Sequence, residues 1–202
     1  MTHYFDQDPE SEHRYRLIEA EFEGQSFSFR TDSGVFSGTE VDYGTALLID
    51  NVLQEEPDAA GRLLDLGSGY GVVSVVFRKL RPDLEIVASD VNRRALELVN
   101  YNLHLNNLSE TEVVESDGLA EIVGDFDLIL LNPPIRAGKE TVYKLYRESH
   151  TALKPEGRFY LVIRKKQGAP STVTELESYW DEVEVIKKKS GYWIIRCTKS
   201  AK

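Results

Sequence analysis

The residues best suited to chemistry in this 202-residue chain form a short turn, Asn132-Pro133-Pro134, directly after an apolar run that ends at Leu131. Two prolines after an asparagine make a rigid turn that cannot continue a strand. The Asn132 side-chain carbonyl and the Pro133 backbone carbonyl can point the same way, and both accept hydrogen bonds. Together they can hold both hydrogens of an amino group, favouring a pyramidal nitrogen whose lone pair is aimed at an electrophilic methyl group. The alternative is a plain loop breaker, because Asn-Pro often marks turns.

A second motif, Asp65-Leu66-Gly67-Ser68-Gly69-Tyr70-Gly71, follows a short apolar strand and precedes a predicted helix. Glycines at such a turn let the backbone bend tightly and leave room for a ligand against it. The spacing is Gly-x-Gly-x-Gly, whereas dinucleotide-binding folds have Gly-x-Gly-x-x-Gly, and an acidic residue precedes it. The pattern therefore favours a cofactor without a pyrophosphate. A tight turn that binds nothing is the alternative.

Two aspartates close the next two strands of the predicted sheet. Asp90 ends an apolar run and can accept both hydroxyls of a ribose. Asn92 is the better N-cap for the helix expected from Arg93, which leaves Asp90 free for a ligand. Asp117, before Gly118, could accept a hydrogen bond from an adenine amino group, and a plain turn aspartate is the alternative.

Alternating hydrophobic periods predict the elements that must position these turns. Strands are expected at 62–66, 85–89, 112–115, 127–131, 158–164, 183–187 and 192–197, and helices at 45–53, 71–80, 93–106, 141–153 and 171–179, the fourth helix closed by a loop at 154–157. The connection 188–191 is too short for a crossover helix, so the last two strands should be antiparallel. The fold class is α/β: a Rossmann-like, doubly wound, seven-stranded, mostly parallel sheet with an antiparallel C-terminal hairpin. A short N-terminal β-hairpin, turning at Glu23-Gly24, precedes it.

Composition limits the partners. Lys and Arg number 24 against 34 Asp and Glu, a formal charge of −10, which argues against broad nucleic-acid affinity but allows a local basic face. The single cysteine, Cys197, permits neither an intramolecular disulfide nor a thiolate metal cluster, so we expect a reducing compartment and no metal. The polar start over 1–12 and the absence of a long apolar stretch predict a cytoplasmic protein that does not contact the membrane.

With these motifs placed, the chain resembles the class I methyltransferases that use S-adenosylmethionine. Within them it resembles the small-domain family, in particular the catalytic domain of the small-subunit ribosomal RNA guanine-N2 methyltransferases. The resemblance covers roughly residues 31–166 and includes Gly34-Val35-Phe36-Ser37 and Asp42-Tyr43-Gly44-Thr45, which generic methyltransferases lack. It implies a tail and hairpin extension over 1–31 and a methyltransferase domain over 32–202.

The resemblance also implies roles for individual residues. Asp65 and Gly67 would line the methionine portion of S-adenosylmethionine, Asp90 would bind its ribose and Asp117 its adenine. The N-terminal segment would close over the cofactor, and Asn132 would act on the target amine. The expected cofactor-binding residues are Phe36, Asp42, Gly44, Asp65, Gly67, Ser68, Gly69, Asp90, Asn92, Asp117, Gly118 and Asn132. Asn132, Pro133 and Pro134 are the expected catalytic residues.

The acceptor side departs from the family at Ile135, where members usually carry an aromatic residue that stacks on the target base. Phe36 or Tyr143 could supply that ring. Members of this type also commonly carry an extra N-terminal domain that assists RNA binding, in place of which this chain has the hairpin. Ile135, Arg136 and Lys139 are the expected substrate-binding residues, and two further basic runs, 164–166 and 187–189, are candidates for phosphate contact.

The leading hypothesis is methylation of an exocyclic amine, guanine N2, during ribosomal RNA processing, with ribosomal RNA or the small subunit as partner and the base splayed from its stack. Alternative acceptors are an adenine amine or a protein glutamine amide. A nicotinamide oxidoreductase is disfavoured by the glycine spacing. A non-catalytic cofactor-binding subunit is the other alternative. The sequence leaves monomer and homodimer open.

Overall fold

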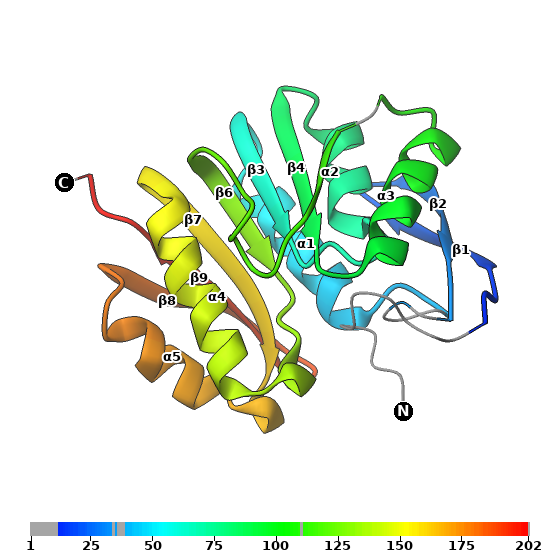
Figure 1. Cartoon of the computed structure of the whole chain (residues 1–202). Helices are drawn as coiled ribbons and strands as arrows, with labels where there is room; N and C mark the ends of the chain where they lie inside the picture. The colour runs from blue at the N-terminus through cyan, green and yellow to red at the C-terminus, as the bar shows by residue number, and fades with distance from the viewer. Residues whose placement is uncertain (1–11, 34, 36–38, 110, 202) are drawn as a thin grey trace.

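The computed structural model describes residues 12–33, 35, 39–109 and 111–201. Its main sheet has seven strands in the order β5-β4-β3-β6-β7-β9-β8 (Figure 1). The strands are β3 (Gly61–Leu66), β4 (Leu84–Asp90), β5 (Glu112–Glu115), β6 (Phe126–Leu131), β7 (Leu153–Arg164), β8 (Glu182–Lys189) and β9 (Tyr192–Thr198). Strand β9 is antiparallel to both neighbours and the other pairs are parallel, which confirms the predicted Rossmann-like sheet.

Helices cover both faces of the sheet (Figure 1). They are α1 (Tyr43–Glu55), α2 (Val72–Leu80) and α3 (Arg93–Leu105) on one face, and α4 (Lys139–Ala152) and α5 (Ala169–Glu177) on the other. Because successive strand residues point to opposite faces, Leu63 joins the core under α1 to α3 and Leu64 joins the core under α4 and α5. Within the described part of the chain, no helix is long and apolar enough to cross a membrane.

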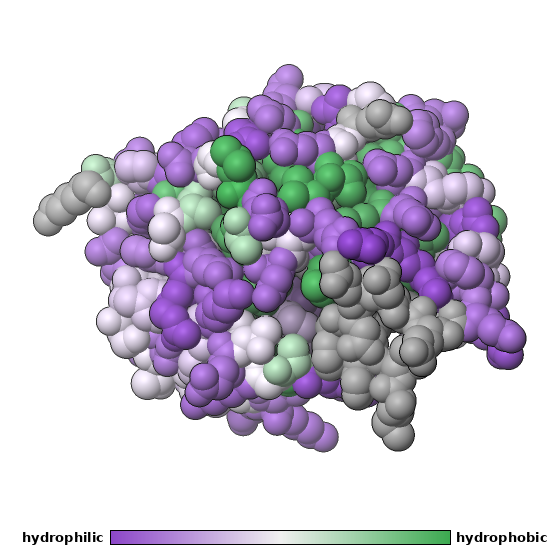
Figure 2. All heavy atoms as spheres, in the orientation of Figure 1, coloured by the Kyte–Doolittle hydropathy of each residue, from purple (hydrophilic) through white to green (hydrophobic). Residues whose placement is uncertain are grey.

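One part of the second face has no helix over it. Residues 116–125, between β5 and β6, form turns, and Leu119 and Ile122 pack on the core in place of a helix. Val123 beside them is 82% exposed. Figure 2 shows a mostly hydrophilic face with an apolar area in its upper middle, over the region where Figure 1 draws β3 and β4.

The N-terminal hairpin consists of β1 (Arg16–Phe22) and β2 (Gln25–Thr31), as predicted. Its two-residue turn places Glu23 at φ 47° and Gly24 at φ 71°, the left-handed conformation that tight hairpins require. Phe27 and Phe29 of β2 are buried in the core cluster that contains α1 to α3. The hairpin therefore shares that core, and the division at residue 31 stays a prediction.

Asn102 of α3 and Asn106, the C-cap of that helix, connect the hairpin to the rest of the fold. The Asn106 amide accepts from the backbone N–H of Ser28 (3.1 Å) and donates to its carbonyl (2.7 Å). Asn102 does the same with Arg30, accepting at 2.7 Å and donating at 3.0 Å. Asn102 also donates to the carbonyl of Tyr70 (2.8 Å), in the glycine motif. One buried side chain thus joins the hairpin to the predicted cofactor loop.

The predicted loop at 154–157 is wrong, because these residues belong to β7. Leu153 already pairs with Phe126 of β6, and a register shift follows before Arg158 pairs with Leu128. Glu156, at φ 64°, donates its N–H to the carbonyl of Lys199 (2.9 Å) beyond β9. Tertiary pairing overrides the local turn signal here. It also extends β8 through residue 189, so the predicted 188–191 connection shortens to Ser190 and Gly191.

Candidate functional site

A cavity of about 440 Å³ lies at the carboxyl ends of β3, β4 and β6, where open α/β sheets bind ligands. It is lined by both motifs singled out in the sequence, which lie more than sixty residues apart. The predicted site residues that line it are Asp42, Asp65, Gly67, Ser68, Gly69, Asp90, Asp117, Gly118, Asn132, Pro133 and Pro134. The fold therefore brings most of the predicted site to one place.

Asp90 is not free, in contrast to the sequence expectation. Its Oδ2 accepts from the backbone N–H of Gly69 (2.8 Å), and its Oδ1 accepts from that of Asn92 (2.9 Å). Gly69 holds φ 54°, a left-handed conformation that glycine adopts without strain. Burial raises the pKa of Asp90, and the backbone hydrogen bonds oppose that rise. The Val91 N–H is a third backbone donor to this carboxylate. A carboxylate has about four acceptor positions, so Asp90 can hold the loop and still accept from a ligand hydroxyl.

Asp65 is a buried carboxyl in the wall of the cavity, 3% exposed. It accepts from the backbone N–H (3.0 Å) and the hydroxyl (2.6 Å) of Ser74. Burial raises the pKa of Asp65 to about 7; the Ser74 bonds lower it and the negative charge of Asp90 adds to the rise. Among the described residues, no cation forms an ion pair with Asp65, so the position suits a positively charged group of a ligand.

Two serine hydroxyls of the cavity wall are unsatisfied. The Oγ atoms of Ser68 and Ser89 are buried and have no hydrogen-bond partner in the described part of the protein. Buried hydroxyls are normally paired, because leaving one unpaired costs about 1–3 kcal/mol. Unpaired hydroxyls beside Asp65 and Asp90 therefore fit a cavity built for a polar cofactor.

Asn132 is held in one orientation by the N-terminus of α1. Its Nδ2 donates to Oδ2 of Asp42 (3.1 Å) and to Oγ1 of Thr45 (2.9 Å). Both donor hydrogens are thereby used, and Oδ1 remains as the amide atom available to a ligand. Asp42 is itself fixed as the N-cap of α1, since its Oδ2 accepts from the Thr45 N–H (3.0 Å). The sequence assigned Asp42 only to the cofactor, and it placed Thr45 in the same motif without a role of its own.

The turn after Asn132 is tight. The Ile135 N–H donates to the Pro133 carbonyl (2.9 Å), and Pro134 has φ −75° and ψ 76°. These values describe an inverse γ-turn. The bond uses one lone pair of the Pro133 oxygen, and a second remains for an amine.

The predicted substrate-binding residues do not line the cavity. Ile135 packs against the core under α4, at the start of the short 3₁₀ helix η1 (Ile135–Ala137). Arg136 and Lys139 are exposed beyond the turn, and the Lys139 ammonium lies 4.9 Å from the ring centre of Tyr143. Tyr143 is half-buried and its hydroxyl donates to the carbonyl of Ser171 (3.2 Å). Their roles toward a substrate stay predictions.

Two predicted cofactor residues, Asn92 and Gly44, have structural roles in the described part of the chain. Asn92 caps α3, accepting from the N–H groups of Arg94 (3.0 Å) and Ala95 (3.3 Å). Gly44 lies in α1, where a Cβ would come within 2.9 Å of Asp42 and Tyr192. Neither lines the cavity. Phe36 lies outside the described residues.

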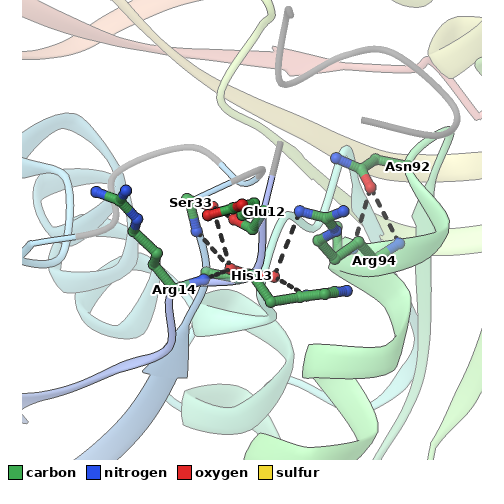
Figure 3. A network of polar contacts seen from close by, with 8 residues as sticks. Glu12, His13, Arg14, Ser33, Asn92 and Arg94 are labelled. Atoms are coloured by element: carbon green, nitrogen blue, oxygen red, sulfur yellow. Dashed lines mark hydrogen bonds and ion pairs between the residues drawn. The ribbon is translucent and has the colours of Figure 1, made fainter. Parts of the chain in front are cut away.

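Asp32 is a buried carboxylate. Figure 3 shows the residues whose polar contacts meet at this position, among them His13, Arg14, Ser33 and Arg94. The Oδ2 of Asp32 lies 2.6 Å from His13 Nδ1 and 3.6 Å from the Arg94 guanidinium. Its Oδ1 accepts hydrogen bonds from the backbone N–H groups of Arg14 and Ser33, both at 2.7 Å. Burial raises the pKa of Asp32, but the hydrogen bonds and the His13 charge outweigh it and hold the pKa below 3.8. These contacts join the N-terminal segment to α3.

A metal site is not part of this arrangement. Among the residues that the structure describes, no group of three His, Cys, Asp or Glu side chains could hold a metal ion. The cavity chemistry consists instead of carboxylates, hydroxyls and a fixed amide.

The sheet order, with a glycine loop and carboxylates at the ends of β3 and β4, defines a Rossmann-like methyltransferase. Residues 26–196 match the family model described as the methyltransferase small domain. The chain belongs to this methyltransferase family, and its cofactor is S-adenosylmethionine. The resemblance inferred from the motifs is thereby confirmed.

Relatives fall into two groups. The chain is 41% identical to the uncharacterized protein YbxB of Bacillus subtilis over 199 residues, 98% of either chain. It is 33% identical over 165 residues to ribosomal RNA small subunit methyltransferase C of Shewanella loihica, covering 80% of this chain and 46% of that relative. The chain thus spans less than half of the latter protein.

A solved structure shares the fold. The 16S rRNA N2 methyltransferase RsmC of T. thermophilus, in complex with AdoMet and guanosine, superposes with a TM-score of 0.83 at 23% identity, over 95% of this chain and 52% of that one. A ribosomal protein L11 methylase of Lactobacillus delbrueckii has a TM-score of 0.67 at 18% identity, over 79% of this chain and 80% of that one. At these identities, both superpositions show that the fold is shared.

Proposed function

We propose that this methyltransferase modifies an exocyclic amine, guanine N2, of small-subunit ribosomal RNA. The observation that carries the proposal is the fixed Asn132 amide, which Asp42 and Thr45 hold with its oxygen available beside the cofactor cavity. The names of the ribosomal RNA relatives favour the same acceptor. Such an acceptor implies a cytoplasmic protein, in keeping with the free, buried Cys197.

The cofactor half of the site would be held by residues from β3 and β4. Asp65 suits the positively charged amino group of the methionine portion, because it is a buried carboxyl without an ion-pair partner in the described residues. Asp90 would accept from the ribose hydroxyls, and Asp117 from the adenine amino group. When bound, S-adenosylmethionine supplies an electrophilic methyl group on a sulfonium.

The acceptor half would orient the amine. Asn132 Oδ1 and the free lone pair of the Pro133 carbonyl would each accept one N–H, which directs the nitrogen lone pair along a single line. Both groups are uncharged and do not titrate near neutral pH. The site therefore acts by orientation and electrostatics and does not withdraw a proton before methyl transfer.

A glutamine amide or an adenine amine could occupy the same two hydrogen-bond acceptors, and Ile135 favours neither of these substrates.

The test is transfer of tritiated methyl from S-adenosylmethionine to small ribosomal subunits and to stripped ribosomal RNA, both from cells that lack this protein. The expected result is label in RNA that Asn132→Ala abolishes, followed by nuclease digestion to methylguanosine. Label in methyladenosine or in protein would contradict the guanine assignment. No label, with cofactor bound, would favour a non-catalytic subunit.

A further inference from the structure

Six basic residues form an exposed edge beside the catalytic turn. The basic edge consists of Arg164, Lys165, Lys166, Lys187, Lys188 and Lys189. The first ends β7, the next two open the 3₁₀ helix η2 (Lys165–Gln167), and the last three end β8. Two backbone features join these runs: Arg164 and Lys189 both pair with Tyr192 of β9, and the Lys165 N–H donates to the carbonyl of Gly191 (2.8 Å).

The basic edge is next to the acceptor half of the site. Leu161 of β7 pairs with Leu131, the residue before Asn132. At about 3.3 Å per residue, Arg164 therefore lies roughly 10 Å further along the neighbouring strand. Tyr43 connects the two regions, because it follows Asp42 in the chain and its hydroxyl donates to Ser190 (3.2 Å), in the turn between β8 and β9.

Aromatic rings are interleaved with these cations. The Arg164 guanidinium lies 4.6 Å from the Tyr192 ring centre, and the Lys188 ammonium 4.1 Å from that of Trp193. Tyr43 packs against Tyr192 with ring centres 5.4 Å apart and is 43% exposed. Cations combined with exposed rings bind single-stranded nucleic acid, because phosphates meet the charges and bases stack on the rings.

Carboxylates neutralise many of the other basic residues that the structure describes. Ion pairs hold nine other cations: Arg62, Arg81, Arg93, Arg94, Lys144, Arg147, Lys154, Arg158 and Arg196. Within the described residues, none of the six edge residues has one. The charge of Lys189 only opposes the rise that burial causes in the pKa of Asp50. In a protein with a net charge of −10, six neighbouring cations without ion pairs point to an anionic partner.

Protection of an edge strand accounts for only half of this pattern. Strand β8 is at the edge of the sheet, and lysines there discourage pairing with other chains. Arg164 ends β7 and Lys165 and Lys166 follow it, and β7 is an interior strand with neighbours on both sides. Their charges serve no such purpose.

We propose that the basic edge binds the phosphate backbone of a single-stranded segment of the RNA substrate and leads the target base to Asn132. Tyr43 offers a stacking surface between the phosphate contacts and the catalytic turn. The inference rests on the proposed function, since it names the surface through which that function reaches its RNA. An acidic protein partner is the competing occupant.

The test compares three double variants of the full chain. The first variant combines Lys165→Ala with Lys166→Ala, and the second combines Lys187→Ala with Lys189→Ala. Each of them removes two cations of the basic edge. Arg14→Ala with Arg16→Ala is the matched control, because it removes two exposed cations near and in the hairpin, which lies at the other end of the sheet (Figure 1). Lys188 is kept because it packs over Trp193. Binding to stripped small-subunit ribosomal RNA is measured by fluorescence anisotropy from 50 to 300 mM salt, with S-adenosylhomocysteine present.

We expect each edge variant to bind RNA about tenfold more weakly than wild type. The steepness of the plot of log binding constant against log salt concentration should fall by about 1.4, because each of the two lost phosphate contacts with a single strand contributes about 0.7. The control should stay within about twofold of wild type, and cofactor affinity should be unchanged in all three. Equal losses in the control and edge variants, or no loss in the edge variants, would overturn the proposal. Edge-dependent labelling of a protein in place of RNA would overturn it too. Failure of wild type to methylate RNA would overturn the proposed function; normal methylation by the edge variants at the wild-type KM would overturn only this inference.

Discussion

The two halves of the site differ in how their polar groups are satisfied. In the cofactor half, Asp90 is bonded to the backbone of its own glycine loop, and Asp65 is bonded to the helix that follows that loop. In the proposed acceptor half, Asn132 is oriented by Asp42 and Thr45 at the N-terminus of α1, and the nearby basic edge is exposed. Substitutions in the first half should therefore weaken structure and cofactor binding together. Substitutions in the second half should change chemistry and leave the fold intact.

The largest effect is expected from Asp90→Ala. It removes the acceptor for the Gly69 and Asn92 N–H groups and for the proposed ribose contacts. Charged hydrogen bonds contribute about 1.5–3 kcal/mol each, so affinity for S-adenosylmethionine should fall at least about hundredfold, with a lower Tm. Isothermal titration and thermal unfolding check this. Asp117→Ala is the matched control on the same cavity, expected to lose only a fewfold because Asp117 is exposed; equal losses would contradict the comparison.

The next effect concerns the link between the hairpin and the glycine loop. Asn102→Ala leaves three backbone groups of Arg30 and Tyr70 without their partner and should lower the free energy of unfolding by about 2 kcal/mol. Asn106→Ala should cost less, because Asn106 is only half-buried and water can replace it. Urea unfolding measures both. A smaller loss for Asn102→Ala than for Asn106→Ala would argue against the link.

Substitutions of Thr45 test whether its hydroxyl orients the Asn132 amide. Thr45→Val removes the hydroxyl that accepts from Asn132 but keeps the shape of the side chain and the α1 backbone. Loss of one hydrogen bond of about 1.4 kcal/mol should slow methyl transfer about tenfold, with cofactor affinity unchanged. Thr45→Ser should restore most of the rate, since it keeps the acceptor. A rate that depends on side-chain bulk and not on the hydroxyl would rule out positioning.

The smallest effect is a pH dependence in the cofactor half. The pKa of Asp65 rises from 3.8 to about 7 on folding, so between these values the native state holds more protons than the unfolded state. The Asp65 contribution to the free energy of unfolding therefore falls as pH rises from about 4 to about 7 and is level above that. A cationic group of the cofactor favours the ionised carboxyl, so affinity should rise about fourfold from pH 6.5 to 8, with proton release. Calorimetry in buffers of different ionisation enthalpy checks this, and Asp65→Asn should abolish the dependence.

The sequence predicts local features well and distant contacts poorly. The order of strands and helices and the glycine motif depend on short-range periodicity and spacing, and the structure confirms them. The amide of Asn132 is oriented by residues 87 and 90 positions earlier, and Asn102 reaches Arg30 across 72 positions. No periodic pattern encodes such pairs. The turn signal at 154–157 failed for a related reason, because pairing with residues after β9 decides its conformation.

The most direct test of the account is single-turnover methyl transfer by Asn132→Ala on unmodified small-subunit ribosomal RNA, measured beside cofactor affinity. Removing one pre-organised hydrogen-bonding group from a catalytic site, such as an oxyanion-hole donor, costs about a hundredfold to a thousandfold in rate. We predict a loss of at least about a hundredfold in the transfer step, with the Kd for S-adenosylmethionine within about threefold of wild type. A transfer rate close to wild type, or equal losses in rate and cofactor affinity, would contradict the assignment of Asn132 to the amine.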